Sequence, residues 1–97
     1  MKIYDIIWKD KFVEKLAVKH RVMINEVEEV LFSSPLVRFW EKGDVAGEDL
    51  YVAYGRTASG RYLAVFFVRK KQTTALPISA RDMTNSERRY YGRQKGH

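Results

Sequence analysis

Two arginines end predicted strands and could together bind a phosphate group. Arg56 closes an alternating segment over 50–56, and Arg81 closes a second β-prone segment further along the chain. If both strands belong to one antiparallel sheet, the two side chains could converge at one edge of it. A guanidinium stays charged and can hold a phosphate through two hydrogen bonds, which suits the stabilisation of charge developing on phosphorus. Alternatively, Arg81 forms a structural ion pair with Asp82 or Glu87.

Three other side chains could transfer a proton or hold an anion. His20 ends a predicted helix, and imidazole changes charge near neutral pH; the alternative is a histidine that only interacts with the helix dipole. Lys19 could hold phosphate or act as a base, or it could be a solvated lysine. Glu48 could be a general base if it is buried, or it could be an ordinary loop carboxylate. The second histidine, His97, is the last residue and is expected to be disordered.

The excess positive charge is confined to the C-terminal part of the chain. The 97 residues hold 18 Lys plus Arg and 12 Asp plus Glu, for a net charge of +6. Residues 1–68 carry ten side chains of each sign, whereas residues 69–97 carry eight basic and two acidic ones. A segregated basic surface indicates a polyanion or an acidic protein as the partner, unless it is simply a solvated face.

The composition excludes several classes of protein. Because Cys is absent, the chain has no disulfide, no thiol nucleophile and no Cys-based zinc site. The longest apolar run, 62–68, is far shorter than the roughly 20 residues of a membrane span. We see no apolar secretion segment behind the N-terminal Met-Lys. We therefore expect one domain over residues 1–97, cytoplasmic and without a membrane partner.

Capping signals mark the starts of three predicted helices. Asp10 is the expected N-cap of the first helix. Asn25 and Glu28 have the spacing of a capping box at the second. Thr84 and Glu87 have the same spacing at the third. The predicted helices are 11–20, a second from Asn25 to the Ser-Ser-Pro at 33–35, and a third from Thr84 to about Arg93 that frays at Gly96.

The strands predict an α+β fold of order β-α-α-β-β-β-β-α. The predicted strands are 2–8, 36–40, 50–56, 61–68 and 73–80. The fourth is the most apolar and should lie at the centre of the sheet, while Pro77 implies an edge position or a bulge for the fifth. An antiparallel meander should pack one face on the helices, and its other face could stay open and polar.

Several short motifs, taken together, resemble the BrnT-like toxins of the RelE/ParE superfamily of type II toxin–antitoxin systems. The most specific is Ile78-Ser79-Ala80-Arg81 followed by Glu87-Arg88 and Tyr91, which resembles the family's C-terminal signature. The other motifs, in family order, are Trp8 with Asp10, Lys19-His20 with Val22, Gly47-Glu48, and Tyr54-Gly55-Arg56 to Gly60-Arg61. The resemblance covers residues from about 4 to 91 and implies a RelE-like fold.

Two positions depart from the family pattern. Arg21 stands where the family usually has a Gly that ends the helix in the left-handed conformation. That conformation costs Arg on the order of 1 kcal/mol, so we expect the helix to end differently here. Leu76 stands where many relatives carry an Arg, which removes one candidate phosphate contact.

The resemblance implies a ribonuclease that arrests growth and is neutralised by a cognate BrnA-like, DNA-binding antitoxin. RNA supplies its own nucleophile, the 2′-hydroxyl, so cleavage needs a base, an acid and cations. The chain has no dense cluster of Asp, Glu and His, which favours a metal-free reaction without a cofactor. We expect the antitoxin to cover the basic sheet edge and the terminal helix.

The site residues follow from these roles. The candidate catalytic residues are Lys19, His20, Glu48, Arg56 and Arg81. The candidate RNA contacts are Trp8, Arg61, Arg88, Arg89, Arg93 and Tyr91, although Trp8 and Tyr91 could instead belong to the core. Two alternatives remain, namely a basic binding module without catalytic activity and a gyrase-directed toxin of the ParE kind on the same scaffold.

Overall fold

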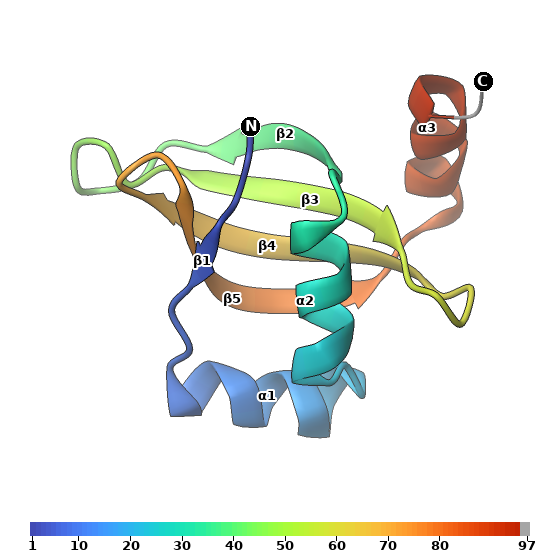
Figure 1. The fold of residues 1–97 in the computed structure, drawn as a ribbon, viewed down its shortest axis with the longest axis horizontal. Coiled ribbons are helices and arrows are strands. Elements are labelled where there is room, and N and C mark those ends of the chain that lie inside the picture. Colours follow the sequence, from blue (N-terminus) through green and yellow to red (C-terminus); the bar gives the residue numbers. More distant parts are fainter. Residues whose placement is uncertain (96–97) are drawn as a thin grey trace.

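The computed structural model describes residues 1–95, which form five strands and three helices in the predicted order (Figure 1). Gly96 and His97, and the expectations placed on them, lie outside the described residues. The elements are β1 (Asp5–Ile6), α1 (Asp10–His20), α2 (Ile24–Phe32), β2 (Leu36–Glu41), β3 (Leu50–Arg56), β4 (Tyr62–Lys70), β5 (Thr74–Asp82) and α3 (Asn85–Lys95). The α+β class and the element order are therefore confirmed.

All five strands belong to one sheet of order β1-β5-β4-β3-β2. Strands β2 to β5 form the predicted antiparallel meander, and β4 is central as expected from its apolar sequence. The first strand is much shorter than predicted and pairs in parallel with β5, through Asp5 opposite Thr74 and Ile6 opposite Ala75. The sheet is therefore mixed, and β2 is the strand at its other edge.

Pro77 sits at a β-bulge, which is one of the two positions predicted for it. Phe66 pairs with Ser79 and Phe67 pairs with Pro77, so Ile78 is the extra residue on β5. Pro77 is fully buried, and the missing N–H is tolerated where the ladder is interrupted. The bulge precedes Arg81 on the same strand and shifts the face that each following side chain occupies.

The front face of the sheet forms the main core with α1 and α2. Alternation along the strands places Ala53, Val65 and Phe67 on this face, where Leu16 and Val30 of the helices complete the cluster. Helix α1 contacts β5, and α2 contacts β3 and β4. Figure 1 shows α2 crossing in front of the sheet. Gly55 belongs to this contact, because a Cβ there would lie only 2.9 Å from the Cγ1 atom of Val30.

The back face of the sheet, which the sequence allowed to stay open and polar, is partly covered by the C-terminal helix. Tyr90 and Tyr91 of α3 pack against a second cluster that contains Val52, Tyr54 and Phe66. Helix α3 lies at one end of the sheet, away from α1 and α2 (Figure 1). It has no buried residue of its own, because its sequence is strongly charged and its two tyrosines, which pack against the cluster, are only partly buried. The helix therefore covers part of the back face and leaves the rest exposed.

Only one of the three predicted helix starts is correct in detail. The N–H of Glu87 donates to the Thr84 hydroxyl and the N–H of Thr84 donates to the Glu87 carboxylate, which confirms the capping box of α3. Helix α1 has Lys9 rather than Asp10 at its N-cap, with no side-chain hydrogen bond. Helix α2 has Met23 at its N-cap, and Glu26 accepts from the Met23 N–H. The predicted capping box of Asn25 with Glu28 is wrong, because the helix begins two residues earlier and Glu26, not Glu28, binds the free N–H at its start.

Arg21 ends α1 in the left-handed conformation, with φ 54° and ψ 39°, so the expectation of a different helix end is wrong. The Val22 N–H donates to the Leu16 carbonyl, which satisfies one of the last carbonyls of the helix. The contacts around the turn therefore impose on Arg the conformation that Gly adopts without strain.

Replacing Arg21 with Gly should stabilise the protein. The left-handed conformation costs a non-glycine residue about 1–2 kcal/mol, and part of the gain is offset by the greater freedom of Gly in the unfolded chain. We expect Arg21→Gly to raise the free energy of unfolding in urea by about 0.5–1 kcal/mol. Arg21→Ala is the matched control, because it removes the same side chain without relieving the backbone. Equal stability of the two variants would contradict the argument.

Candidate functional site

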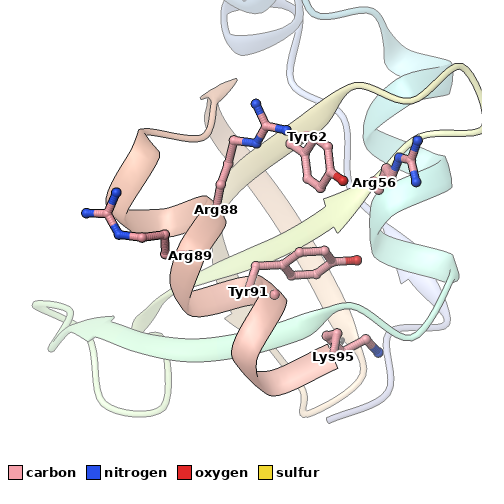
Figure 2. Close-up of a pocket in the computed structure, with 7 residues that line it drawn as sticks. Arg56, Tyr62, Arg88, Arg89, Tyr91 and Lys95 are labelled. Carbon is pink, nitrogen blue, oxygen red and sulfur yellow. The ribbon is translucent and has the colours of Figure 1, made fainter. Parts of the chain in front are cut away.

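A cavity of about 490 Å³ opens between α3 and the ends of β3 and β4. Its seven lining residues include four cations and two phenols. They are Arg56, Tyr62, Arg88, Arg89, Tyr91, Gly92 and Lys95 (Figure 2). Within the part of the chain that the structure describes, no carboxylate or imidazole lines this cavity. An anion that enters it meets several positive groups and no negative one.

The strand register brings the first half of the cavity together. Arg56 at the end of β3 pairs with Tyr62 at the start of β4, so both side chains lie on the back face of the sheet. The Arg56 guanidinium lies 5.3 Å from the centroid of the Tyr62 ring. A Cβ on Gly60, whose φ is +95°, would lie 3.4 Å from an Arg56 nitrogen, so the guanidinium also lies against the hairpin.

Helical spacing on α3 supplies the second half. Arg88, Tyr91, Gly92 and Lys95 are three, four and seven residues apart and therefore share one side of the helix. Arg88 places its guanidinium 4.2 Å from the Tyr62 ring centroid, and Tyr91 meets the same ring edge-on at 6.1 Å. Tyr62 thus holds two guanidinium groups in place through cation–π contacts.

The side chains of the cavity do not all point the same way. The hydroxyl groups of Tyr62 and Tyr91 are directed toward the side where Arg56 lies (Figure 2). Arg89 is directed away from them, and its guanidinium donates a hydrogen bond to the Ser86 hydroxyl at 3.3 Å. The Lys95 ammonium donates to the Ser34 carbonyl at 2.9 Å. Arg56, Arg88 and the two phenols therefore form the centre of the site.

Arg81 lies on the same back face as Arg56 but takes part in a different contact. Arg81 pairs with Ala64, while Arg56 pairs with Tyr62, so β4 separates the two arginines. The Arg81 guanidinium donates two hydrogen bonds to Glu87, at 2.6 and 3.0 Å. The structural ion pair that the sequence left open is therefore present, and Arg81 does not line the cavity.

The Arg81–Glu87 pair shifts the ionisation of its members. Hydrogen bonds from Arg81 lower the pKa of Glu87, and the Thr84 N–H adds to this effect. The hydrogen bond with Glu87 raises the pKa of Arg81. Burial raises the pKa of Tyr54, whose hydroxyl donates to Glu87 at 3.4 Å, and the negative charge of Glu87 acts in the same direction. The ion pair therefore fastens the first turn of α3 to β5.

Because of this ion pair, we expect the free energy of unfolding to fall in acid. Because the folded-state pKa of Glu87 is below its ordinary value of 4.5, its stabilisation is present above that pH and is lost as the pH falls through the folded pKa. We expect Glu87→Gln to cost about 1–2 kcal/mol at neutral pH, and the difference from wild type to shrink in acid. Urea unfolding of both proteins at a series of pH values from neutral to acid measures this difference. Glu14→Gln, at an exposed position, is the control. A difference that does not depend on pH would contradict the assignment.

Arg61 was expected to contact RNA, but its guanidinium is bound inside the protein. It donates to Asp82 at 2.7 Å, to the Arg21 carbonyl at 2.7 Å, to Glu26 at 3.2 Å and to the His20 carbonyl at 3.1 Å. These bonds join the end of α1, the start of α2 and the end of β5. The hydrogen bond with Asp82 raises the pKa of Arg61. Arg61 lies outside the cavity because successive side chains alternate between the two faces of the sheet. Arg61 therefore faces the front, while Tyr62 faces the back.

The three candidates for proton transfer lie away from the cavity. Lys19 is exposed on α1, in a shallow depression that it shares with Lys11, Glu14, Lys15 and Val18. His20 is half-buried at the end of that helix, on the side of the sheet opposite α3. Glu48 lies before β3, at the far end of the strand from Arg56, and pairs with Lys70 at 3.1 Å. The structure therefore does not bring these residues to Arg56.

The remaining expected RNA contacts divide between cavity, surface and core. Arg88, Arg89 and Tyr91 line the cavity, and Arg93 is exposed on α3 outside its lining. Trp8 is half-buried and packs against the main core, which is the alternative left open for it. Leu76 is buried with 7% of its surface exposed, so this position offers no phosphate contact.

Three lining residues, Tyr62, Gly92 and Lys95, were missed in the sequence. Tyr62 could have been found only from the strand register, because the five residues 57–61 separate it from Arg56, with which it pairs across the hairpin. Lys95 could have been found from its spacing of seven residues after Arg88 on one helix.

Comparison with known families decides the class of protein. Residues 8–87 match the family described as the ribonuclease toxin, BrnT, of type II toxin–antitoxin systems. The chain belongs to the BrnT toxin family. The 1.1 Å crystal structure of the Brucella abortus ribonuclease toxin BrnT has the same fold, with a TM-score of 0.60 and 22% identity over 84% of this chain and 97% of that chain. No curated protein matches the chain.

Membership of the BrnT family confirms the resemblance inferred from the Ile-Ser-Ala-Arg signature. The family implies RNA as the target and an antitoxin as the partner. The BrnT match includes Arg56 and Tyr62 but ends at residue 87, just before the α3 residues of the cavity. Over residues 1–95 we find no helix with the length and apolar character that crossing a membrane requires.

Proposed function

We propose that this BrnT-family chain is a metal-independent endoribonuclease whose active site is the cavity between α3 and the β3–β4 hairpin. The observation that carries the proposal is a single cavity lined by four cations and two phenols. Cations fixed in this way can stabilise the negative charge that develops on phosphorus during cleavage. That is the role a metal ion would otherwise play, so the protein itself supplies the positive charge.

The arrangement suggests a role for each central residue. Arg56 and Arg88 hold the non-bridging oxygens of a phosphodiester, in the bidentate manner that guanidinium groups allow. The 2′-hydroxyl attacks the phosphorus, the new O2′–P bond forms and the P–O5′ bond breaks. Tyr62 and Tyr91 are the lining groups that can both accept and donate a proton. One phenol oxygen accepts the proton of the 2′-hydroxyl as its own hydroxyl proton passes to the leaving 5′-oxygen, directly or through the second phenol, so no net proton is gained or lost.

The test is cleavage of a defined RNA by purified, antitoxin-free protein. We expect products with a 2′,3′-cyclic phosphate and a 5′-hydroxyl, and an unchanged rate after EDTA is added. A deoxy substitution at the cleaved nucleotide should abolish the reaction, because it removes the nucleophile. A folded preparation that cuts neither free RNA nor ribosome-bound mRNA would overturn the proposal, as would activity that EDTA removes.

We also propose that the antitoxin is BrnA-like, covers the basic side of α3 and thereby prevents growth arrest in the cytoplasm. The support is electrostatic, because the cavity residues on α3 would attract an acidic segment as well as RNA. RNA and antitoxin should then compete for the free toxin. Simultaneous binding of both would count against this arrangement.

One observation favours a second candidate function, a basic binding module without catalysis. The described lining lacks both carboxylate and imidazole, which are the commonest general bases. Such a module would bind RNA with an affinity that falls steeply with salt and would leave the RNA intact. Analysis of the bound RNA after prolonged incubation distinguishes the two functions. A supercoiling assay with gyrase tests the ParE-like alternative on the same preparation.

A further inference from the structure

The back face of the sheet carries a second group of aromatic and basic side chains, outside the cavity. We define this sheet-face cluster as Arg38, Trp40, Phe66 and Arg81. We propose that the cluster is a second subsite for single-stranded RNA, with Trp40 as the side chain on which a base stacks. The proposal rests on the proposed ribonuclease function and extends it to the part of the substrate outside the cleaved bond.

Trp40 is held in position but remains available to a ligand. Its side chain leaves 46% of its surface exposed and meets the Phe66 ring edge-on, at 5.0 Å and 78°. The register between β2 and β3 shifts between Phe39 and Glu41, which makes Trp40 the extra residue of a bulge. Ordinary alternation along this edge strand places Phe39 on the front face, against Tyr51, and Trp40 on the back face, against Phe66.

Two guanidinium groups border the exposed indole. Arg81 lies 5.2 Å from the Phe66 centroid, so Trp40 and Arg81 contact the same ring. Arg38, exposed on β2, lies 4.3 Å from the Tyr90 centroid. Aromatic rings that stack on bases, next to cations that attract the backbone, are the usual means of holding a single strand.

The cluster and the cavity lie on the same face of the molecule. Tyr62 and Phe66 both project from the back face of β4, four residues and therefore about 13 Å apart along the strand. Helix α3 borders both surfaces, because Tyr91 lines the cavity and Tyr90 contacts Arg38. A strand of RNA held in the cavity can therefore continue along α3 to Trp40.

The distribution of charge indicates where an RNA strand on this face would end. Beyond Trp40, the segment 41–49 carries four carboxylates and one lysine. Lys70 offsets one of these carboxylates by pairing with Glu48. The remaining negative charge would repel a phosphate backbone, whereas the exposed Arg38 attracts it; Arg81 is already paired with Glu87 and serves to hold the Phe66 ring. The cluster therefore suits the terminal part of a bound single strand.

Fluorescence of Trp40 provides a direct test. The chain contains two tryptophans, so Trp8→Phe leaves Trp40 as the only tryptophan, whose emission is excited selectively over that of the tyrosines. The probe is a short single-stranded RNA with 2′-O-methyl groups, which binds but cannot be cut. We expect saturable quenching of Trp40 by this probe, and little quenching by a duplex of the same sequence.

A matched pair of variants in the full-length chain tests the energetic role. Trp40→Ala should weaken binding of the same labelled probe about tenfold or more, as expected for the loss of one stacked base. Phe39→Ala is the control, since Phe39 is the preceding residue, leaves 56% of its surface exposed and contacts Tyr51 on the front face. Phe39→Ala should leave the affinity unchanged. Circular dichroism of each variant confirms that it is folded.

Three results would overturn the inference. They are a Trp40 signal that does not change when the probe binds, equal affinity of Trp40→Ala and wild type, and an equal loss in Phe39→Ala. A Trp40 signal that responds to the antitoxin but not to RNA would instead assign the cluster to a protein partner. Cleavage assays keep the two proposals distinct, because cleavage without a Trp40 response removes only the subsite, and a response without cleavage removes only the nuclease.

Discussion

Replacement of Arg56 with Ala is expected to lower the rate of RNA cleavage at least a hundredfold. Arg56 lies at the centre of the cavity, and the loss of one fixed donor to a developing negative charge typically costs about 10²–10³ in rate. The side chain is exposed and lies against the hairpin and Tyr62, so the fold should survive its removal. Single-turnover cleavage of a defined RNA measures the effect.

Two further variants make the Arg56 result specific. Arg56→Lys keeps the charge but loses the two-pronged geometry, so its rate should lie between those of wild type and Arg56→Ala. Arg69→Ala removes the same charge from the β4–β5 hairpin, where the Arg69 guanidinium donates to the Gln72 carbonyl. Its cleavage rate should stay near wild type. If Arg56→Ala cuts RNA as fast as Arg69→Ala, Arg56 does not hold the reacting phosphate.

Replacement of Arg61 with Ala should have the largest effect on stability, lowering the free energy of unfolding by about 2–4 kcal/mol. The change leaves Glu26, whose side chain is 17% exposed, without its cation. It also removes the donor to the His20 and Arg21 carbonyls at the end of α1. Asp82 is 66% exposed and contributes less, because water can solvate it. Urea denaturation of the purified variant measures the loss.

The Arg61 prediction has its own internal control. Arg61→Lys retains one charge but cannot reach two carboxylates and two carbonyls at once, so it should recover only part of the lost stability. Arg69→Ala again serves as the comparison for simple loss of an arginine. If Arg61→Ala and the wild type have the same urea midpoint of unfolding, these contacts contribute nothing measurable to stability.

The sequence predicted most of the fold because the relevant signals are local. Alternation along 50–56 correctly separated Val52 and Tyr54 from Ala53, which pack in the two different clusters. Thr84 and Glu87 form a contact within one helical turn, and their capping box was predicted correctly. Helix starts near Met23 were harder to predict, because several residues within one turn can satisfy the same free N–H groups.

The site was predicted only in part. Arg56 and the α3 residues Arg88, Arg89 and Tyr91 were named from the sequence, and the structure gathers them in one cavity. Lys19, His20 and Glu48 were expected beside Arg56, but each lies elsewhere on the molecule. Their types suit the chemistry, yet nothing in a single sequence indicates to which end or face of the sheet a loop or helix end is carried.

By itself, the sequence determined the element order, the central strand, the segregation of positive charge and the alternation of side chains along 50–56. Only the tertiary structure decided which arginines remain available to a ligand. Glu26 and Asp82 capture Arg61 from positions 35 and 21 residues away, and the placement of α3 on the back face gives Glu87 to Arg81. The physical reason is that a guanidinium pairs with whichever carboxylate folding brings within a few ångströms, and this proximity depends on packing between elements distant in the chain.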